Sequence, residues 1–159
     1  MFLAYDGDSA GINATLRAGF ALLKGGVEPK IIEIPDNLDP DDWVKNEGAN
    51  VFISEGVHKA ISLLNFKLKS SNFSKVSPSE KSNIIKDVLS EVNKIQDPII
   101  QQNLVNGLAQ AAGVEENQII HMLSKLLATH KSEKSKDKKN KSSKLFSTVN
   151  GKAELGIIQ

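Results

Sequence analysis

Two short apolar segments, each followed directly by aspartates, constrain the fold of this 159-residue chain most strongly. The first covers residues 2–5, and the second covers residues 30–34 and is β-branched. Between them, apolar side chains recur at the spacing of one helix face, at Ile12, Leu16, Phe20 and Leu23. A strand, a helix and a strand of this length predict two parallel strands joined by a right-handed crossover. Both strands would then end at the same edge of one sheet.

The chain beyond these strands has helical patterning up to residue 129, so the predicted fold class is α/β followed by all-α. A short helix is expected from about Pro40 and another over Ala60–Leu68. Ser77-Pro78-Ser79-Glu80 has the form of a capping box with proline at the first helical position. Asp97-Pro98 again places a capping residue before proline, and Gly113 is a typical helix end. The apolar positions expected on the core-facing sides of these helices are Ile61, Leu64, Leu68, Ile84, Val88, Val92, Ile95, Ile100, Leu104, Leu108, Ala111, Ile119, Leu123 and Leu126.

Composition excludes several classes of chemistry and location. The absence of cysteine excludes disulfides, thiolate catalysis, iron–sulfur clusters and cysteine-ligated zinc within these residues. The three histidines, His58, His121 and His130, have no metal-ligand spacing. No apolar run reaches the roughly eighteen residues of a membrane span, and the first residues lack a signal-peptide pattern. We therefore expect a soluble, cytoplasmic protein with no membrane partner.

Charge divides the chain into unlike parts. Residues 1–55 carry a net charge of −6, residues 56–129 carry +2, and residues 130–159 carry +5. Residues 130–144 contain seven lysines and no large apolar residue, which predicts a disordered linker. Residues 145–159 become apolar again and are interpreted as the start of a truncated further domain.

Acidic residues follow both predicted strands. Asp6-Gly7-Asp8 follows the first strand, and the run from Asp36 to Asp42 follows the second. Loops at the carboxyl ends of neighbouring parallel strands line one crevice, so these carboxylates are expected to converge. A cluster of like charges is most readily tolerated around a divalent cation, and ligation by oxygen alone indicates Mg²⁺ or Mn²⁺.

Other interpretations of the aspartates remain open at this point. Asp39 suits an N-cap as well as it suits a metal ligand, whereas two acids on either side of a glycine exceed what capping requires and favour a metal site. A calcium loop beginning at Asp6 would place Arg17 where the bidentate glutamate belongs, which argues against it. An aspartyl-phosphate enzyme would need a lysine and a hydroxyl residue at later strand ends, and the chain has too few strands.

The acidic motifs carry a family resemblance. Tyr5-Asp6-Gly7-Asp8-Ser9-Ala10-Gly11 is followed by Ile34-Pro35-Asp36-Asn37-Leu38-Asp39-Pro40-Asp41-Asp42-Trp43-Val44 and by Glu47-Gly48. In this order and spacing they resemble the second half of the TOPRIM fold in bacterial DnaG-type primases. The resemblance implies the C-terminal half of TOPRIM at 1–55, the helical subdomain at 56–129, a lysine-rich linker at 130–144 and the start of a helicase-binding domain at 145–159.

The resemblance also implies a function. Family members are DNA-dependent RNA polymerases that make short primers on single-stranded DNA from ribonucleoside triphosphates, within the replisome. Asp6, Asp8, Asp39 and Asp41 match the family's metal-binding, catalytic carboxylates, with Mg²⁺ or Mn²⁺ as cofactor. The family's zinc site, catalytic glutamate and template groove would precede Met1, and most of the part that binds the replicative helicase would follow Gln159. We therefore expect an internal fragment that is inactive alone.

Two other functions compete with this prediction. The helical hairpins could serve a non-catalytic module that binds a helicase or another replication partner. A TOPRIM nuclease is a further alternative within the enzyme class. Trp43, the largest apolar side chain, is expected to anchor its short helix to the sheet rather than to stack on a base.

Overall fold

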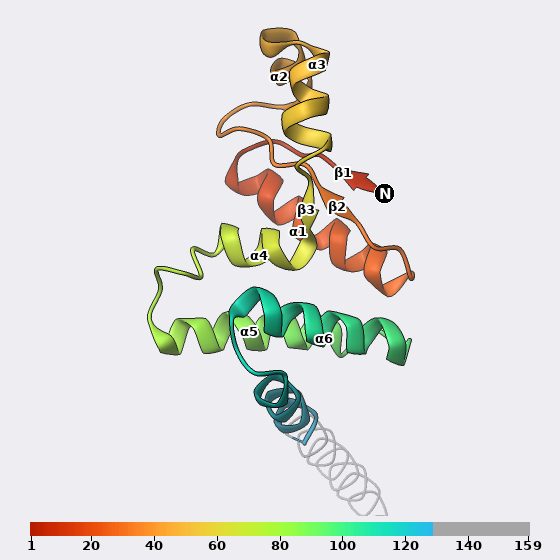
Figure 1. Cartoon of the computed structure of the whole chain (residues 1–159), viewed down its shortest axis with the longest axis vertical. Helices are drawn as coiled ribbons and strands as arrows, with labels where there is room; N and C mark the ends of the chain where they lie inside the picture. The colour runs from red at the N-terminus through yellow and green to blue at the C-terminus, as the bar shows by residue number, and fades with distance from the viewer. Residues whose placement is uncertain (129–159) are drawn as a thin grey trace, which may run out of the picture.

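The computed structural model describes residues 1–128. An α/β unit with a small sheet lies at one end, and a layer of helices packs beneath it (Figure 1). The predicted fold class, α/β followed by helices, is confirmed for these residues. The linker predicted at 130–144 and the domain start predicted at 145–159 lie outside the described residues.

The predicted strand–helix–strand unit is present. It consists of β1 (Phe2–Leu3), α1 (Ser9–Lys24) and β2 (Lys30–Ile31). β1 and β2 pair in parallel, with Phe2 opposite Lys30 and Leu3 opposite Ile31. Backbone hydrogen bonding continues past the strand, because the Ile32 N–H donates to the Leu3 carbonyl at 2.9 Å. The carboxyl ends of the two strands therefore lie at one edge, as predicted.

A third strand corrects one expectation. Residues 60–62 were predicted to begin a helix, but β3 (Ile61–Ser62) pairs antiparallel with β2. Helix α4 (Leu63–Ser70) begins only afterwards, because the Ser62 side chain caps it by accepting from the Asn65 N–H at 3.2 Å. Ile61 pairs with the free edge of β2, which gives a mixed sheet in the order β1-β2-β3. The helical spacing of the apolar residues does not indicate this pairing.

The acidic run leads into a short helical segment. It contains α2 (Pro40–Glu47), α3 (Ala49–Val51) and the π-helix η1 (Phe52–Val57). Trp43 on α2 is buried against Ile32 and Ile34, and its ring meets Phe52 edge to face at 5.3 Å. The expected anchoring of α2 to the sheet is confirmed. Because only 6% of Trp43 is exposed, its indole presents no open face for stacking on a base.

The helical part begins at the predicted caps. Ser77 and Glu80 form a complete capping box at the start of α5 (Pro78–Val92). Asp97 caps α6 (Pro98–Ala112), and Gly113 ends that helix in the left-handed conformation, with φ of 66°. Residues 116–128 form a further helical stretch. These boundaries agree with the sequence because each is set by a local hydrogen bond.

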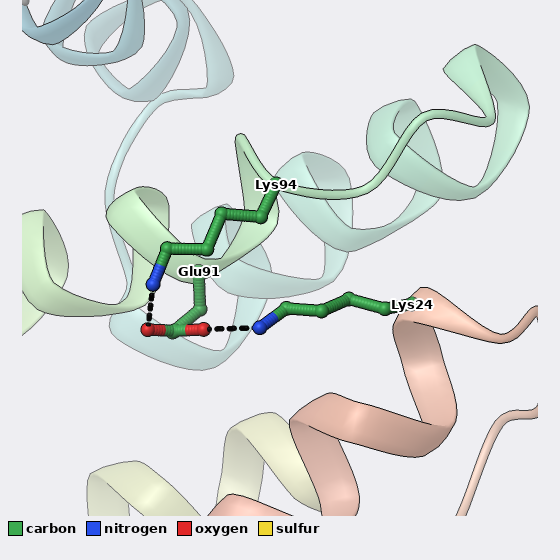
Figure 2. Close-up of polar contacts among 3 residues, drawn as sticks. All are labelled: Lys24, Glu91 and Lys94. Carbon is green, nitrogen blue, oxygen red and sulfur yellow. Dashed lines mark hydrogen bonds and ion pairs between the residues drawn. The ribbon is translucent and has the colours of Figure 1, made fainter.

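One main core joins the two parts of the chain. α4 packs against α1 on one side and α6 on the other. The fully buried residues at its centre come from β2, α5, α6 and the last helix: Ile31, Val88, Leu89, Val92, Leu108 and Ile119. An ion-pair network also bridges the two parts. Glu91 of α5 pairs with Lys24 at the end of α1 and with Lys94, which follows α5 (Figure 2). Within residues 1–128 no helix has the length and apolarity needed to cross a membrane.

Candidate metal centre

The two acidic loops are held together by their backbones. The Gly7 N–H donates to the Leu38 carbonyl at 2.8 Å, and the Asn37 N–H donates to the Gly7 carbonyl at 3.4 Å. A Cβ at residue 7 would lie 2.1 Å from the Pro35 carbonyl oxygen, so this approach requires glycine. The predicted meeting of the loops at the strand ends is thus observed in the backbone.

Two of the four predicted ligands cap helices. Asp8 accepts from the Gly11 N–H at the start of α1, and Asp39 accepts from the Asp42 N–H at the start of α2, both at 2.7 Å. In each case the bond uses Oδ1. An ionised carboxylate has further acceptor sites, so capping fixes the side chain without occupying all of it. The capping interpretation of Asp39 is therefore confirmed, and its role as a metal ligand stays a prediction.

A carboxylate group that could hold a cation is present at the second loop. Oxygen atoms from Asp39, Asp41 and Asp42 all lie within 4.8 Å of one another. Asp6 and Asp8 do not belong to this group or to another such group in residues 1–128. The structure thus brings together two of the four predicted ligands, Asp39 and Asp41, with Asp42 as a third carboxylate.

Asp42 was not among the predicted ligands, although the sequence carries a signal for its position. It lies three residues after the N-cap, where its N–H bonds the Asp39 carboxylate and holds the two residues close. Asp41 forms an ion pair with Lys45 at 2.5 Å. The hydrogen bond and charge of Asp41 raise the pKa of Lys45, so this lysine remains a cation beside the carboxylates.

A small cavity of about 170 Å³ lies beside the first loop. Asp6 and Asp36 line it on the loop side, and α4 contributes Lys69, which pairs with Glu33 at 2.8 Å. Sequence reasoning missed this part of the site, because nothing local to residues 63–70 shows that α4 folds back over the strand ends. The cavity is thus lined by one lysine together with Asp6 of the first loop and Asp36 of the second.

The donor set decides what such a site can bind. The aspartates of both loops are exposed, apart from the half-buried Asp39. Carboxylate oxygens are ligands for hard divalent cations, and exposed sites of this kind keep several water ligands, as Mg²⁺ prefers. The arrangement therefore suits a hard divalent cation that keeps part of its water shell.

Comparison with known proteins relates this geometry to a family. The Toprim-like family matches residues 1–44, which hold β1, α1, β2 and both acidic loops. The chain is 32% identical over 124 residues to the DNA primase of Clostridium acetobutylicum, which covers 77% of this chain and 20% of that protein. It is 31% identical over 111 residues to the DNA primase of Enterococcus faecalis, covering 68% of this chain and 18% of that protein.

The resemblance to bacterial DnaG-type primases is confirmed. Solved primase structures also share the fold. A DnaG catalytic core superposes with a TM-score of 0.56 at 24% identity, covering 74% of this chain and 40% of the other. A DNA primase domain from Pseudomonas aeruginosa gives a TM-score of 0.60 at 20% identity, covering 77% of this chain and 40% of the other. The chain spans about a fifth of the length of the curated primases it matches.

Proposed function

We propose that this chain supplies metal-binding carboxylates to the nucleotidyl-transfer site of a DNA primase. The complete protein would make short RNA primers on single-stranded DNA. The observation that carries the proposal is the pairing of the two acidic loops, Gly7 to Leu38, at the ends of parallel strands. A structural neighbour described as a DnaG primase catalytic domain bound to single-stranded DNA supports the template class.

The proposed ligands are Asp6, Asp8, Asp39 and Asp41. Bound Mg²⁺ or Mn²⁺ would activate a primer 3′-hydroxyl and stabilise charge on the α-phosphate of a ribonucleoside triphosphate. The aspartates themselves would hold the metal ion and orient it. Asp8 and Asp39 are fixed by their helix caps, and Asp41 lies one turn from Lys45, which offsets part of the local negative charge. The replicative helicase is proposed as a partner of the complete protein.

Metal binding is tested with Mn²⁺ as a paramagnetic probe. Titration of the chain should broaden the backbone amide signals of both acidic loops before those of α5 and α6. Asn caps helices about as well as Asp, so Asp8→Asn and Asp39→Asn remove the charge and keep the cap. Each variant should weaken Mn²⁺ binding, whereas Asp87→Asn on α5 should not. Equal broadening in all variants would contradict the proposed ligands.

Catalysis is tested in the complete protein. Asp6→Asn or Asp8→Asn should lower priming by orders of magnitude across a Mg²⁺ titration while folding is retained. The same buffer should support ribonucleotide incorporation and no cleavage of nucleic acid, which separates a primase from a TOPRIM nuclease. Near-normal priming by either variant would remove that residue from the mechanism.

We further propose that the 159-residue chain alone does not synthesise primers, because family members add a further catalytic glutamate and a template surface. Template-dependent ribonucleotide incorporation by this chain would contradict that proposal. Helicase binding without any metal dependence would instead favour the non-catalytic partner-binding module.

A further inference from the structure

A second and larger cavity lies between the α/β unit and the helical layer. Its volume is about 600 Å³, within the roughly 300–1,000 Å³ of small-molecule sites. The walls come from the end of α1, the residues that lead into β2, the start of α4 and one face of α6. In Figure 1 these segments meet where α1 and α4 lie above α6. The cavity is large enough for a ligand of some ten to twenty non-hydrogen atoms, roughly the lower range of drug-sized molecules.

This cavity is separate from the acidic loops. Leu23 and Gly26 line it at the carboxyl end of α1, whereas Asp8 caps the amino end of the same helix. A helix of 16 residues is about 24 Å long. A ligand in the cavity would therefore not touch the aspartates, and the inference goes beyond the proposed function.

The lining combines an apolar floor with a few polar groups. Leu23, Leu63, Leu64 and Leu104 are buried, and Ile100 and Ala111 are half-buried. Glu28 is the only charged residue in the lining. The polar side chains beside it are amides and a hydroxyl, contributed by Asn65, Asn103, Gln110 and Ser62.

The charged and amide side chains of the lining, Glu28, Asn65, Asn103 and Gln110, are exposed. Across residues 1–128, the side chains of Glu28, Asn103 and Gln110 make no hydrogen bond or ion pair with another residue. An ionised carboxylate accepts only, while each amide can both donate and accept. With no basic side chain in the lining, the field of Glu28 favours a cation over an anion.

We propose that this cavity binds a small amphipathic cation. The apolar body of the ligand lies against Leu64, Ile100 and Leu104, and its protonated amine lies near the carboxylate of Glu28. Asn103 and Gln110 provide further hydrogen-bond partners for the polar end. The ligand class is thus an alkyl or aryl-alkyl amine, and the site is formed jointly by α1, α4 and α6.

The test uses the 159-residue chain and three probes of matched shape. Phenylbutylamine carries a cation, phenylbutanol is neutral and phenylbutyrate is an anion. In NMR titrations of the methyl-labelled chain, phenylbutylamine should shift the methyl signals of Leu64, Ile100 and Leu104 saturably. Phenylbutanol should bind more weakly, and phenylbutyrate should bind least.

Two variants locate the binding. Glu28→Gln should weaken phenylbutylamine binding roughly two- to fivefold, as expected for one exposed ion pair, and should abolish its preference over phenylbutanol. Glu115→Gln, which removes an exposed carboxylate outside the lining, should leave binding unchanged. In Gly107→Leu the new side chain would enter the cavity, because a Cβ there lies 3.4 Å from Leu64 Cδ1, and binding should be lost.

Three outcomes would overturn the proposal. These are no saturable methyl shifts at millimolar phenylbutylamine, shifts spread over residues outside the lining, or equal affinity for the three probes. Glu28→Gln should leave Mn²⁺ broadening at the acidic loops unchanged. Failure of the amine site and failure of the metal site are therefore read from different signals in the same chain.

Discussion

At the residue scale, single aspartates in this chain serve local structure and charge at once. Asp8 and Asp39 each end an extended loop and begin a helix, with one oxygen on a backbone N–H. The same residues are the proposed metal ligands, so a substitution to alanine mixes two effects. Their chemistry can be separated because asparagine retains the cap and loses the charge.

Asp39→Ala should therefore destabilise the chain, by about 1 kcal/mol, because the Asp42 N–H loses its acceptor. Asp39→Asn should stay within a few tenths of a kcal/mol of the unsubstituted chain. Urea denaturation without divalent cations measures both. Equal destabilisation by the two variants would show that charge, and not capping, sets the contribution of Asp39 to stability.

Gly7→Ala is the second prediction at this scale. The new methyl group would meet the Pro35 carbonyl at 2.1 Å, so the two loops must separate or the backbone must shift. We expect weaker Mn²⁺ binding together with lower stability, seen by NMR broadening and urea denaturation. Gly107→Ala in α6 is the matched control, because its Cβ has room and a helical glycine gains from alanine. Unchanged Mn²⁺ binding in Gly7→Ala would show that the loop pairing does not position the ligands.

At the element scale, helix starts in the second half of the chain are set by local hydrogen bonds. In α5 the Ser77 Oγ accepts from the Glu80 N–H, and the Glu80 carboxylate accepts from the Ser77 N–H at 2.9 Å. The Ser77 hydroxyl also donates to the Glu80 carboxylate at 2.6 Å. This bond first, and the bond from the Ser77 N–H second, lower the pKa of Glu80. α5 also carries the fully buried Val88, Leu89 and Val92, so its stability is tied to that of the core.

Ser77→Ala should destabilise the chain by about 1 kcal/mol, because the first turn of α5 loses one side of its capping box. Ser82→Ala is the control, since Ser82 lies in the next turn of α5 and its side chain makes no hydrogen bond within residues 1–128. Thermal unfolding followed by circular dichroism compares the two. A larger effect from Ser82→Ala would mean that the capping box does not set the start of this helix.

At the scale of the whole molecule, packing and one ion-pair network join the α/β unit to the helices. Glu91 bonds Lys94 at 2.5 Å and Lys24 of α1 at 2.9 Å, across 67 residues of sequence (Figure 2). Lys94, and then Lys24, lower the pKa of Glu91. A carboxylate with a depressed pKa stabilises the fold above its unfolded-state pKa, and that contribution is lost as the pH falls through the folded-state pKa.

Glu91→Gln should therefore lower stability at neutral pH by at most about 1 kcal/mol, since both lysines are partly exposed. Below about pH 4 the difference from the unsubstituted chain should shrink as the glutamate is protonated. Urea denaturation at neutral pH and below about pH 4 measures the stability difference, with Asp87→Asn as control. A difference that persists unchanged in acid would assign the effect of Glu91 to packing.

The sequence by itself determined the features that local physics controls. Three helix caps and one helix end depend on residues within four positions of one another: the caps at Asp39, Ser77 and Asp97, and the end at Gly113. The strand–helix–strand order follows from the spacing of apolar residues along the chain. The predicted metal ligands follow from acidic residues placed after two parallel strands. The meeting of the two acidic loops could be predicted because parallel strands share an edge, and the metal-ligand roles of their aspartates stay a proposal.

Only the tertiary structure decided the contacts between distant segments. Ile61 joins the sheet because β2 offers it a partner edge, although its spacing fits a helix. Asp42, rather than Asp6 or Asp8, completes the carboxylate group with Asp39 and Asp41, because loop geometry sets distances that residue spacing does not. The cavity near Glu28 exists because α4 packs between α1 and α6. Such packing depends on the shapes of surfaces far apart in the chain, which no local pattern encodes.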